Sequence, residues 1–153
     1  MNLNIKVNGE DWGLDVAPAD TLLDVLRERI GTKSPKIGCE RGDCGSCTVV
    51  LDGRSVRSCL VLAVEADGRE VTTVEGISYE GLSELQNLFI ENNSFQCGFC
   101  APGIVLSATE LLENNPDPTR HDVQEALAGN LCRCTGYEPI IDAVLAAGKE
   151  GSE

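Results

Sequence analysis

The chain has 153 residues, of which 25 are acidic and 12 are basic, so its net charge at neutral pH is −13. Such a charge repels nucleic acid and anionic membrane surfaces, and it favours solubility or docking to a basic partner. Residues 1–6 lack the pattern of a secretory signal, and no apolar run approaches the length of a membrane span. We therefore expect a soluble cytoplasmic protein that binds neither nucleic acid nor membranes.

The first part of the chain is predicted to be rich in β-structure. Residues 3–7 and 12–16 alternate in polarity around Asn8-Gly9, a dipeptide typical of β-hairpins. A helix is expected over residues 21–30, capped by Asp20 or Thr21 and ended by Gly31. Further strands are expected at residues 48–51, from Ser55 onward after an Asp52-Gly53 turn, and at 71–74.

The second part is predicted to be entirely helical. Thr119 and Asp122 have the spacing of a capping box, and Gly129 is a stop signal for the helix that they begin. The composition changes between residues 75 and 82, so we predict one domain over residues 1–76 and another over residues 77–153. The expected helices span residues 81–93, 102–113, 119–128 and 139–147.

The eight cysteines fall into two sets of four, and in an intracellular protein an even number of cysteines favours metal over disulfides. Cys39, Cys44 and Cys47 form C-x4-C-x2-C, and Cys59 follows, which is the plant-type [2Fe–2S] spacing. Glycines within this loop would leave backbone N–H groups free to approach an anionic cluster. They are Gly38, Gly42 and Gly45.

The second set consists of a C-x-x-C, Cys97 and Cys100, and a C-x-C, Cys132 and Cys134. Each pair precedes a predicted helix that has a proline near its first turn. Two helix N-termini would direct free N–H groups towards one anionic cluster. A zinc site or a redox-active C-x-x-C remains an alternative, although the redox motif usually accompanies a βαβ pattern, which is missing here.

Three segments together resemble the small iron–sulfur subunit of the molybdenum hydroxylases, the family of xanthine dehydrogenase, aldehyde oxidoreductase and carbon monoxide dehydrogenase. They are GCERGDCGSCTVVLDG at 38–53, QCGFCAPG at 96–103 and GNLCRCTGY at 129–137. The resemblance implies an α+β fold, in which a β-grasp ferredoxin-like domain precedes an all-α four-helix domain. It also implies a large subunit with molybdopterin and a medium subunit with FAD, in a heterotrimer.

The resemblance implies a role for particular residues, none of them catalytic. Cys97, Cys100, Cys132 and Cys134 correspond to the ligands of a cluster beside molybdopterin. Gln96 corresponds to a residue that binds the pterin, with Cys134 beside it. The other four cysteines correspond to the ligands of a cluster that faces the flavin, near Arg41 and Gly42. Departures from the family pattern occur at Arg41, Ser46 and Ala101, none of which is a ligand.

These observations leave three functions in competition. The first is an electron-transfer subunit of a molybdenum-dependent hydroxylase or dehydrogenase, which passes electrons from molybdenum through two [2Fe–2S] clusters to FAD. The second is a free ferredoxin with two clusters and exchangeable partners. The third is a zinc-stabilised interaction module without redox activity.

Overall fold

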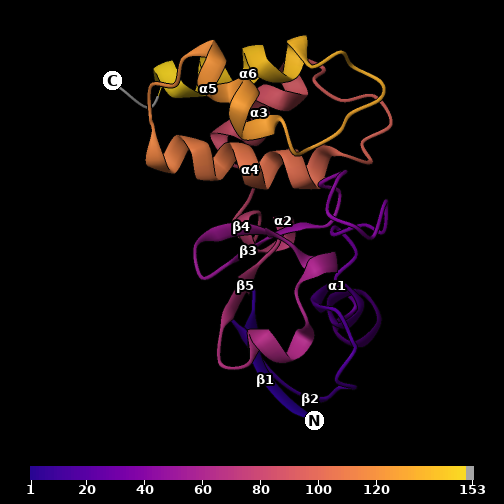
Figure 1. Ribbon diagram of the computed structural model, residues 1–153. Coiled ribbons are helices and arrows are strands. Elements are labelled where there is room, and N and C mark those ends of the chain that lie inside the picture. The colour runs from indigo at the N-terminus through magenta and orange to yellow at the C-terminus, as the bar shows by residue number, and fades with distance from the viewer. Residues whose placement is uncertain (151–153) are drawn as a thin grey trace.

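The computed structural model describes the backbone of residues 1–150 and the side chains of residues 1–148. Figure 1 shows two parts joined end to end, which we call the sheet half (β1 to β5 with the helices between them) and the helical half (α2 to α6). This arrangement confirms the predicted α+β fold. The strands are β1 (Asn2–Val7), β2 (Glu10–Asp15), β3 (Thr48–Leu51), β4 (Arg54–Arg57) and β5 (Glu70–Thr72). The helices are α1 (Leu22–Asp24), η1 (Val25–Ile30), η2 (Ser58–Leu60), η3 (Ala63–Ala66), α2 (Val74–Ile77), α3 (Glu84–Glu91), α4 (Ala101–Asn114), α5 (Arg120–Leu127) and α6 (Glu138–Glu150).

The sheet has the strand order β2-β1-β5-β3-β4, in which β1 and β5 run parallel and the two hairpins run antiparallel. Along β1, Leu3, Ile5 and Val7 are buried while the residues between them are exposed, as the alternation in sequence predicts. The first hairpin turns at Asn8 (φ 53°) and Gly9 (φ 84°), the left-handed conformations that a two-residue turn of this kind requires. The predicted hairpin is confirmed.

The helix predicted over residues 21–30 is present, but its second part differs from an α-helix. Thr21 caps α1 through a capping box with Asp24, and Gly31 ends the helix with φ 91°. From Val25 to Ile30 the backbone forms the wider turns of a π-helix. Over six residues, hydrophobic spacing does not distinguish the two helix types, because Val25 and Leu26 face the core in both.

Two other element boundaries differ from the prediction for local reasons. Strand β5 ends at Thr72, because Val74 already begins the short helix α2. Helix α3 begins after Ser83 rather than at residue 81, because the Ser83 hydroxyl accepts a hydrogen bond from the Gln86 N–H and the Gln86 side chain caps Ser83 in return. The Thr119 capping box at α5 is confirmed.

Each half has a core of its own. In the sheet half, α1 and η1 cover the sheet with Leu22, Val25 and Leu26. In the helical half, α3, α4, α5 and α6 meet around a separate apolar cluster, and α2 packs against its edge. The most deeply buried members of that cluster are Ile104, Ala108, Val123, Ile140, Ala143 and Val144.

Helix α4 lies across the junction and contacts β3 and β4, as Figure 1 shows. The approach is close: a Cβ atom added to Gly45 would lie 2.2 Å from the Gly129 carbonyl oxygen, and one added to Gly103 would lie 2.4 Å from the Gly45 carbonyl oxygen. Gly45 also has φ 73°, which favours glycine. Glycine is therefore required on both sides of this contact.

A polar network fixes this junction. The Asn130 side chain is buried, and its amide donates to the Gly45 carbonyl and to the Thr48 hydroxyl, each at 3.3 Å. The Asn130 Oδ1 atom accepts a hydrogen bond from the Ser107 hydroxyl at 2.9 Å. The Arg57 guanidinium also spans the junction, donating to Thr48 Oγ1 at 2.8 Å and to a carbonyl oxygen of the helical half at 2.7 Å. Asn130 thus connects both halves with one side chain.

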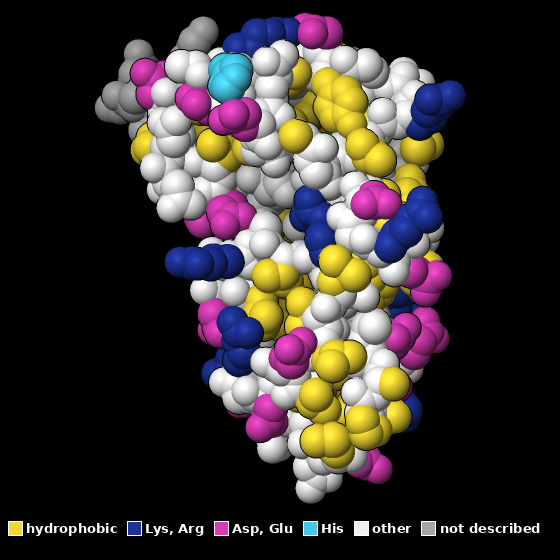
Figure 2. Space-filling model, in the orientation of Figure 1, with side chains coloured by type: hydrophobic (Ala, Val, Ile, Leu, Met, Phe, Trp, Pro, Cys, Tyr) yellow, Lys and Arg dark blue, Asp and Glu magenta, His cyan; other side chains and the backbone are white. Residues whose placement is uncertain are grey.

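Charged side chains of both signs are scattered over the visible face of the molecule rather than gathered in one basic patch (Figure 2). Among the helices of residues 1–150, none has the length and apolarity needed to cross a lipid bilayer.

We expect Asn130→Ala to lower the free energy of unfolding by about 1–3 kcal/mol, because it leaves the buried Ser107 hydroxyl without its partner and removes both amide contacts across the junction. Denaturation by urea, followed by circular dichroism, measures this change. Asn114→Ala is the matched control, since that exposed amide donates only to a carbonyl in its own helix. Equal effects of the two substitutions would contradict the role of Asn130.

Candidate metal centres

The first predicted set, Cys39, Cys44, Cys47 and Cys59, comes together at one edge of the sheet half. Cys39 and Cys44 lie on the loop between η1 and β3, Cys47 directly precedes β3, and Cys59 lies on η2. The Cys44 N–H donates to the Cys39 sulfur at 3.3 Å, and the Cys59 thiol is close enough to Cys47 to hydrogen-bond with it. The fold therefore gathers four sulfur atoms from two separate segments.

The loop stabilises negative charge on one of these sulfurs. Backbone N–H groups of Arg41 first, and then of Cys44 and Asp43, lower the pKa of the Cys39 thiol to about 6. The lowered pKa favours the thiolate form of Cys39, which is the form that coordinates metals. Burial, followed by the neighbouring Cys47 thiol, raises the pKa of Cys59 to about 11. Positive charge at the centre of the set would stabilise all four thiolates together.

Two glycines of this loop lie where a side chain would not fit or would be strained. Gly42 has φ 86° and Glu40, two residues earlier, has φ 55°, so the chain turns tightly between Cys39 and Cys44. A Cβ atom added to Gly38 would lie only 2.7 Å from the Cys44 sulfur. The loop is thus shaped as a cradle that a side chain would obstruct.

The second predicted set, Cys97, Cys100, Cys132 and Cys134, comes together at one end of the helical half. Cys100 is the residue before α4, with a proline in the first turn as predicted, and α6 begins four residues after Cys134. The Cys97 and Cys134 sulfurs lie 3.6 Å apart. Burial, followed by a hydrogen bond with Cys132, raises the pKa of Cys100 to about 12. The Phe99 N–H, followed by the Cys134 thiol, lowers the pKa of Cys97.

Tyr137 supports the C-x-C loop and was not predicted as a site residue. Its hydroxyl accepts a hydrogen bond from the Cys132 N–H at 2.8 Å and donates to the Asn130 carbonyl at 2.9 Å. Its backbone has φ 70°, an uncommon conformation for a tyrosine. The Thr135 hydroxyl lies 3.1 Å from the Cys132 sulfur. The signal in the sequence was a polar aromatic residue five positions after a candidate ligand.

One hydrogen bond joins the two sets directly. The Leu131 N–H donates to the Cys44 carbonyl at 2.8 Å, and Leu131 is the residue before Cys132. The backbone of one candidate ligand is therefore connected to the backbone of another through a single residue and a single hydrogen bond.

The remaining predicted site residues lie on the surface around these sets. Gln96 is exposed, and its amide donates to the Cys134 carbonyl at 3.1 Å. Arg41 is exposed and forms an ion pair with Asp43 at 3.0 Å. Gly42 lies beneath the exposed Leu60, whose Cδ1 atom would be 2.5 Å from an added Cβ.

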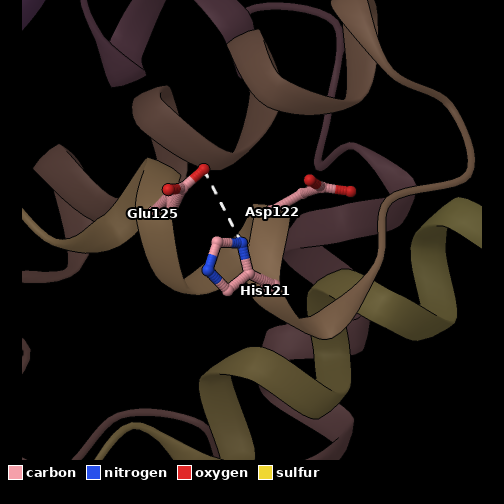
Figure 3. A group of neighbouring side chains, drawn as sticks. All are labelled: His121, Asp122 and Glu125. Atoms are coloured by element: carbon pink, nitrogen blue, oxygen red, sulfur yellow. Dashed lines mark ion pairs between the residues drawn. The ribbon is translucent and has the colours of Figure 1, made fainter.

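A further group of possible metal ligands lies on the surface of α5 and consists of His121, Asp122 and Glu125 (Figure 3). His121 Nδ1 lies 3.7 Å from a Glu125 carboxylate oxygen, and both side chains are highly exposed. Asp122 serves the helix cap, because its Oδ2 atom accepts a hydrogen bond from the Thr119 N–H at 2.7 Å. We interpret this group as a polar helix surface.

We expect Tyr137→Phe to lower the free energy of unfolding by about 1–3 kcal/mol, because the Cys132 N–H and the Asn130 carbonyl lose a partner. The midpoint of thermal unfolding measures the effect. Tyr79→Phe makes the same chemical change at a side chain that is 89% exposed, and it should leave the midpoint unchanged. A similar shift in both variants would show that the hydroxyl of Tyr137 has no special role.

We expect Gly38→Ala to reduce the metal bound per purified chain by up to about half, since one of two sets would be obstructed. Elemental analysis of the purified protein measures it. Gly13→Ala is the control, because its added Cβ would lie 3.7 Å from the nearest atom, an ordinary contact. Full metal content in Gly38→Ala would contradict the proposed cradle.

Two family models together span most of the chain. The first, a 2Fe-2S iron-sulfur cluster binding domain, matches residues 5–76. The second, a [2Fe-2S] binding domain, matches residues 73–145. Each match contains one of the two cysteine sets. The chain therefore carries iron–sulfur binding domains.

Known proteins resemble the chain over nearly its whole length. The nicotine 6-hydroxylase small subunit of Paenarthrobacter nicotinovorans is 50% identical, covering 96% of this chain and 89% of that protein. The structure of quinoline 2-oxidoreductase from Pseudomonas putida 86 matches with a TM-score of 0.91 and 46% identity, covering 100% of this chain and 98% of the matched chain. Aldehyde oxidoreductase from Desulfovibrio desulfuricans ATCC 27774 matches with a TM-score of 0.93 and 43% identity, covering 99% of this chain but 17% of the longer one. The chain therefore belongs to the family of [2Fe–2S] iron–sulfur subunits of the molybdenum hydroxylases.

Proposed function

We propose that this chain passes electrons from a molybdopterin site on a large subunit, through two [2Fe–2S] clusters of its own, to FAD on a medium subunit. Each [2Fe–2S] cluster, when bound, accepts and releases one electron at a time. The observation that carries the proposal is the assembly of two separate four-cysteine sets that one backbone hydrogen bond connects. The chain itself would perform no substrate chemistry.

The residues of both sets fit iron–sulfur clusters. We assign Cys39, Cys44, Cys47 and Cys59 to one cluster, held by residues 1–76, and Cys97, Cys100, Cys132 and Cys134 to the other, held by residues 77–153. Sulfur is the donor that such clusters use, and backbone N–H groups face the first set as an anionic centre requires. Both the sulfur donors and the backbone N–H groups therefore suit an iron–sulfur cluster.

The spacing of the sulfur atoms supports a binuclear cluster rather than a single zinc ion. Tetrahedral zinc with four thiolates places its sulfurs about 3.8 Å apart, as follows from Zn–S bonds of about 2.3 Å. Among the residues whose side chains are described, the only three ligand atoms that all lie within 4.8 Å of one another belong to the surface group on α5. Among the described side chains, neither cysteine set therefore has three sulfurs as close together as a single tetrahedral zinc ion requires.

The hydrogen bond between Leu131 and Cys44 supports transfer from one cluster to the other. It connects two candidate ligand loops across the junction, where hydrogen bonds of Asn130 and Arg57 also link the halves. A fixed separation between redox centres is what an electron carrier needs, because it allows transfer without rearrangement. The junction therefore has the properties of a connection between two centres.

The exposed residues around the sets support the assignment of partners. Cys134 and Cys97 are exposed, so the second cluster would lie near the surface, where Gln96 could bind the pterin of the large subunit. Arg41 and Gly42 lie beside the first set and would face FAD on the medium subunit. The relative named a small subunit agrees with such an assembly, which we propose is a heterotrimer.

We expect the native complex to contain about four irons and four labile sulfides per copy of this chain, together with molybdenum and FAD. Elemental, sulfide and flavin analysis of the complex purified from its source measures this. Zinc without sulfide would contradict the proposal and would indicate a zinc-stabilised interaction module instead. Iron and sulfide without molybdenum or flavin would indicate a free two-cluster ferredoxin.

We also expect Cys47→Ser and Cys100→Ser each to remove about two of the four irons, because each belongs to a different set. Iron analysis and electron paramagnetic resonance (EPR) spectra of the two variants measure which cluster is lost. Loss of the same signal in both variants would contradict the assignment of ligands.

A further inference from the structure

Lys36 belongs to the sheet half, three residues before Cys39, but its ammonium faces the helical half. The Lys36 Nζ atom lies 5.5 Å from the centroid of the Phe99 ring. Phe99 is one of the two residues between Cys97 and Cys100. One half of the chain thus places a cation against the C-x-x-C loop of the other half.

The backbone around Lys36 is firmly held. Its N–H donates to the Ser46 carbonyl at 2.9 Å. The Arg27 guanidinium donates to the Pro35 carbonyl at 2.7 Å, and the Ser34 N–H donates to the Glu75 carboxylate at 3.1 Å. The position of the ammonium is therefore set by a braced loop as well as by its own side chain.

The charge of Lys36 is not neutralised locally. Among the residues with described side chains, no carboxylate lies within 4.0 Å of its ammonium, whereas Lys33 pairs with Glu28 at 3.6 Å. The side chain is partly buried, so its field is less screened than that of a surface lysine.

The Lys36 ammonium faces the C-x-x-C loop of the second set, because it lies over the Phe99 ring between Cys97 and Cys100. Burial and the nearby Arg27 lower the pKa of Lys36, whereas the charges of Cys100, Glu75 and Cys97 oppose that change. The ammonium is directed across the junction.

We propose that Lys36 sets the reduction potential of the cluster held by Cys97, Cys100, Cys132 and Cys134. Reduction adds an electron to an anionic centre, and a fixed cation stabilises the more negative state, so the charge raises the potential. The cluster nearer the molybdenum site becomes a better electron acceptor only when the two halves are docked. This inference rests on the proposed function, which supplies the two clusters.

The test is Lys36→Gln in the intact complex, with a redox titration followed by EPR. At a fixed potential, the ratio of oxidised to reduced cluster in the helical half should rise about fivefold. That change corresponds to a potential lower by about 40 mV, at 59 mV per tenfold for one electron. The cluster of the sheet half should shift less.

Two further variants separate charge from structure. Lys36→Arg retains the cation and should keep the potential near that of the wild type. Lys33→Gln removes an exposed lysine from the same loop and should change neither cluster, because its charge is already paired and more exposed. A full shift in Lys33→Gln would show that the effect comes from general surface charge and would overturn the assignment to Lys36.

The wild-type titration separates a failure of the proposed function from a failure of the inference about Lys36. If the complex gives no EPR signal from a cluster in the helical half, the proposed function fails, and the inference about Lys36 fails with it. If both signals are present and Lys36→Gln moves neither, or moves both equally, the inference about Lys36 is wrong and the electron-transfer function stands.

Discussion

The hydrogen bond from the Leu131 N–H to the Cys44 carbonyl connects the two cysteine sets, on whose relative position the proposed function depends. Each cysteine set is built on loops, which would move independently if nothing joined them. This bond links the two loops to each other, and buried Asn130 and partly buried Arg57 add further hydrogen bonds across the same contact. The cores on either side supply stability to each half, but only the junction determines how the two sets are arranged.

The cysteine spacing, the first turn and the helix cap could be predicted from the sequence, because each depends on only a few neighbouring residues. The spacing of Cys39, Cys44 and Cys47 restricts which metal centre a short loop can surround. The Asn8-Gly9 turn and the Thr119 capping box follow from backbone preferences of single residues, and both are present. The α+β fold could be predicted because strand patterns dominate the first part of the chain and helix patterns the second, and because the three cysteine segments resemble a family with that fold. The assignment of each sulfur to a cluster stays a prediction.

The features that could not be predicted depend on contacts between distant residues. Nothing in the sequence around Asn130 indicates that its amide contacts Gly45 and Thr48, more than 80 positions away. The position of the Lys36 ammonium over the Phe99 ring could not be predicted either, because it depends on how the two halves pack together. The π-helical turns of η1 were missed for a different reason: six residues are too few for a period to distinguish 3.6 residues per turn from a wider helix.

The close approach of Gly45 to Gly129 and of Gly103 to Gly45 has a consequence for protein engineering and for evolution. The two halves resemble separable modules, and a designer would be tempted to exchange the sheet half for another ferredoxin. The graft would succeed only if it carried glycine at the point of contact and a hydroxyl within reach of the Asn130 amide. The halves are therefore constrained to change together, because a substitution at the junction would disturb the arrangement of the two cysteine sets before it disturbed either core.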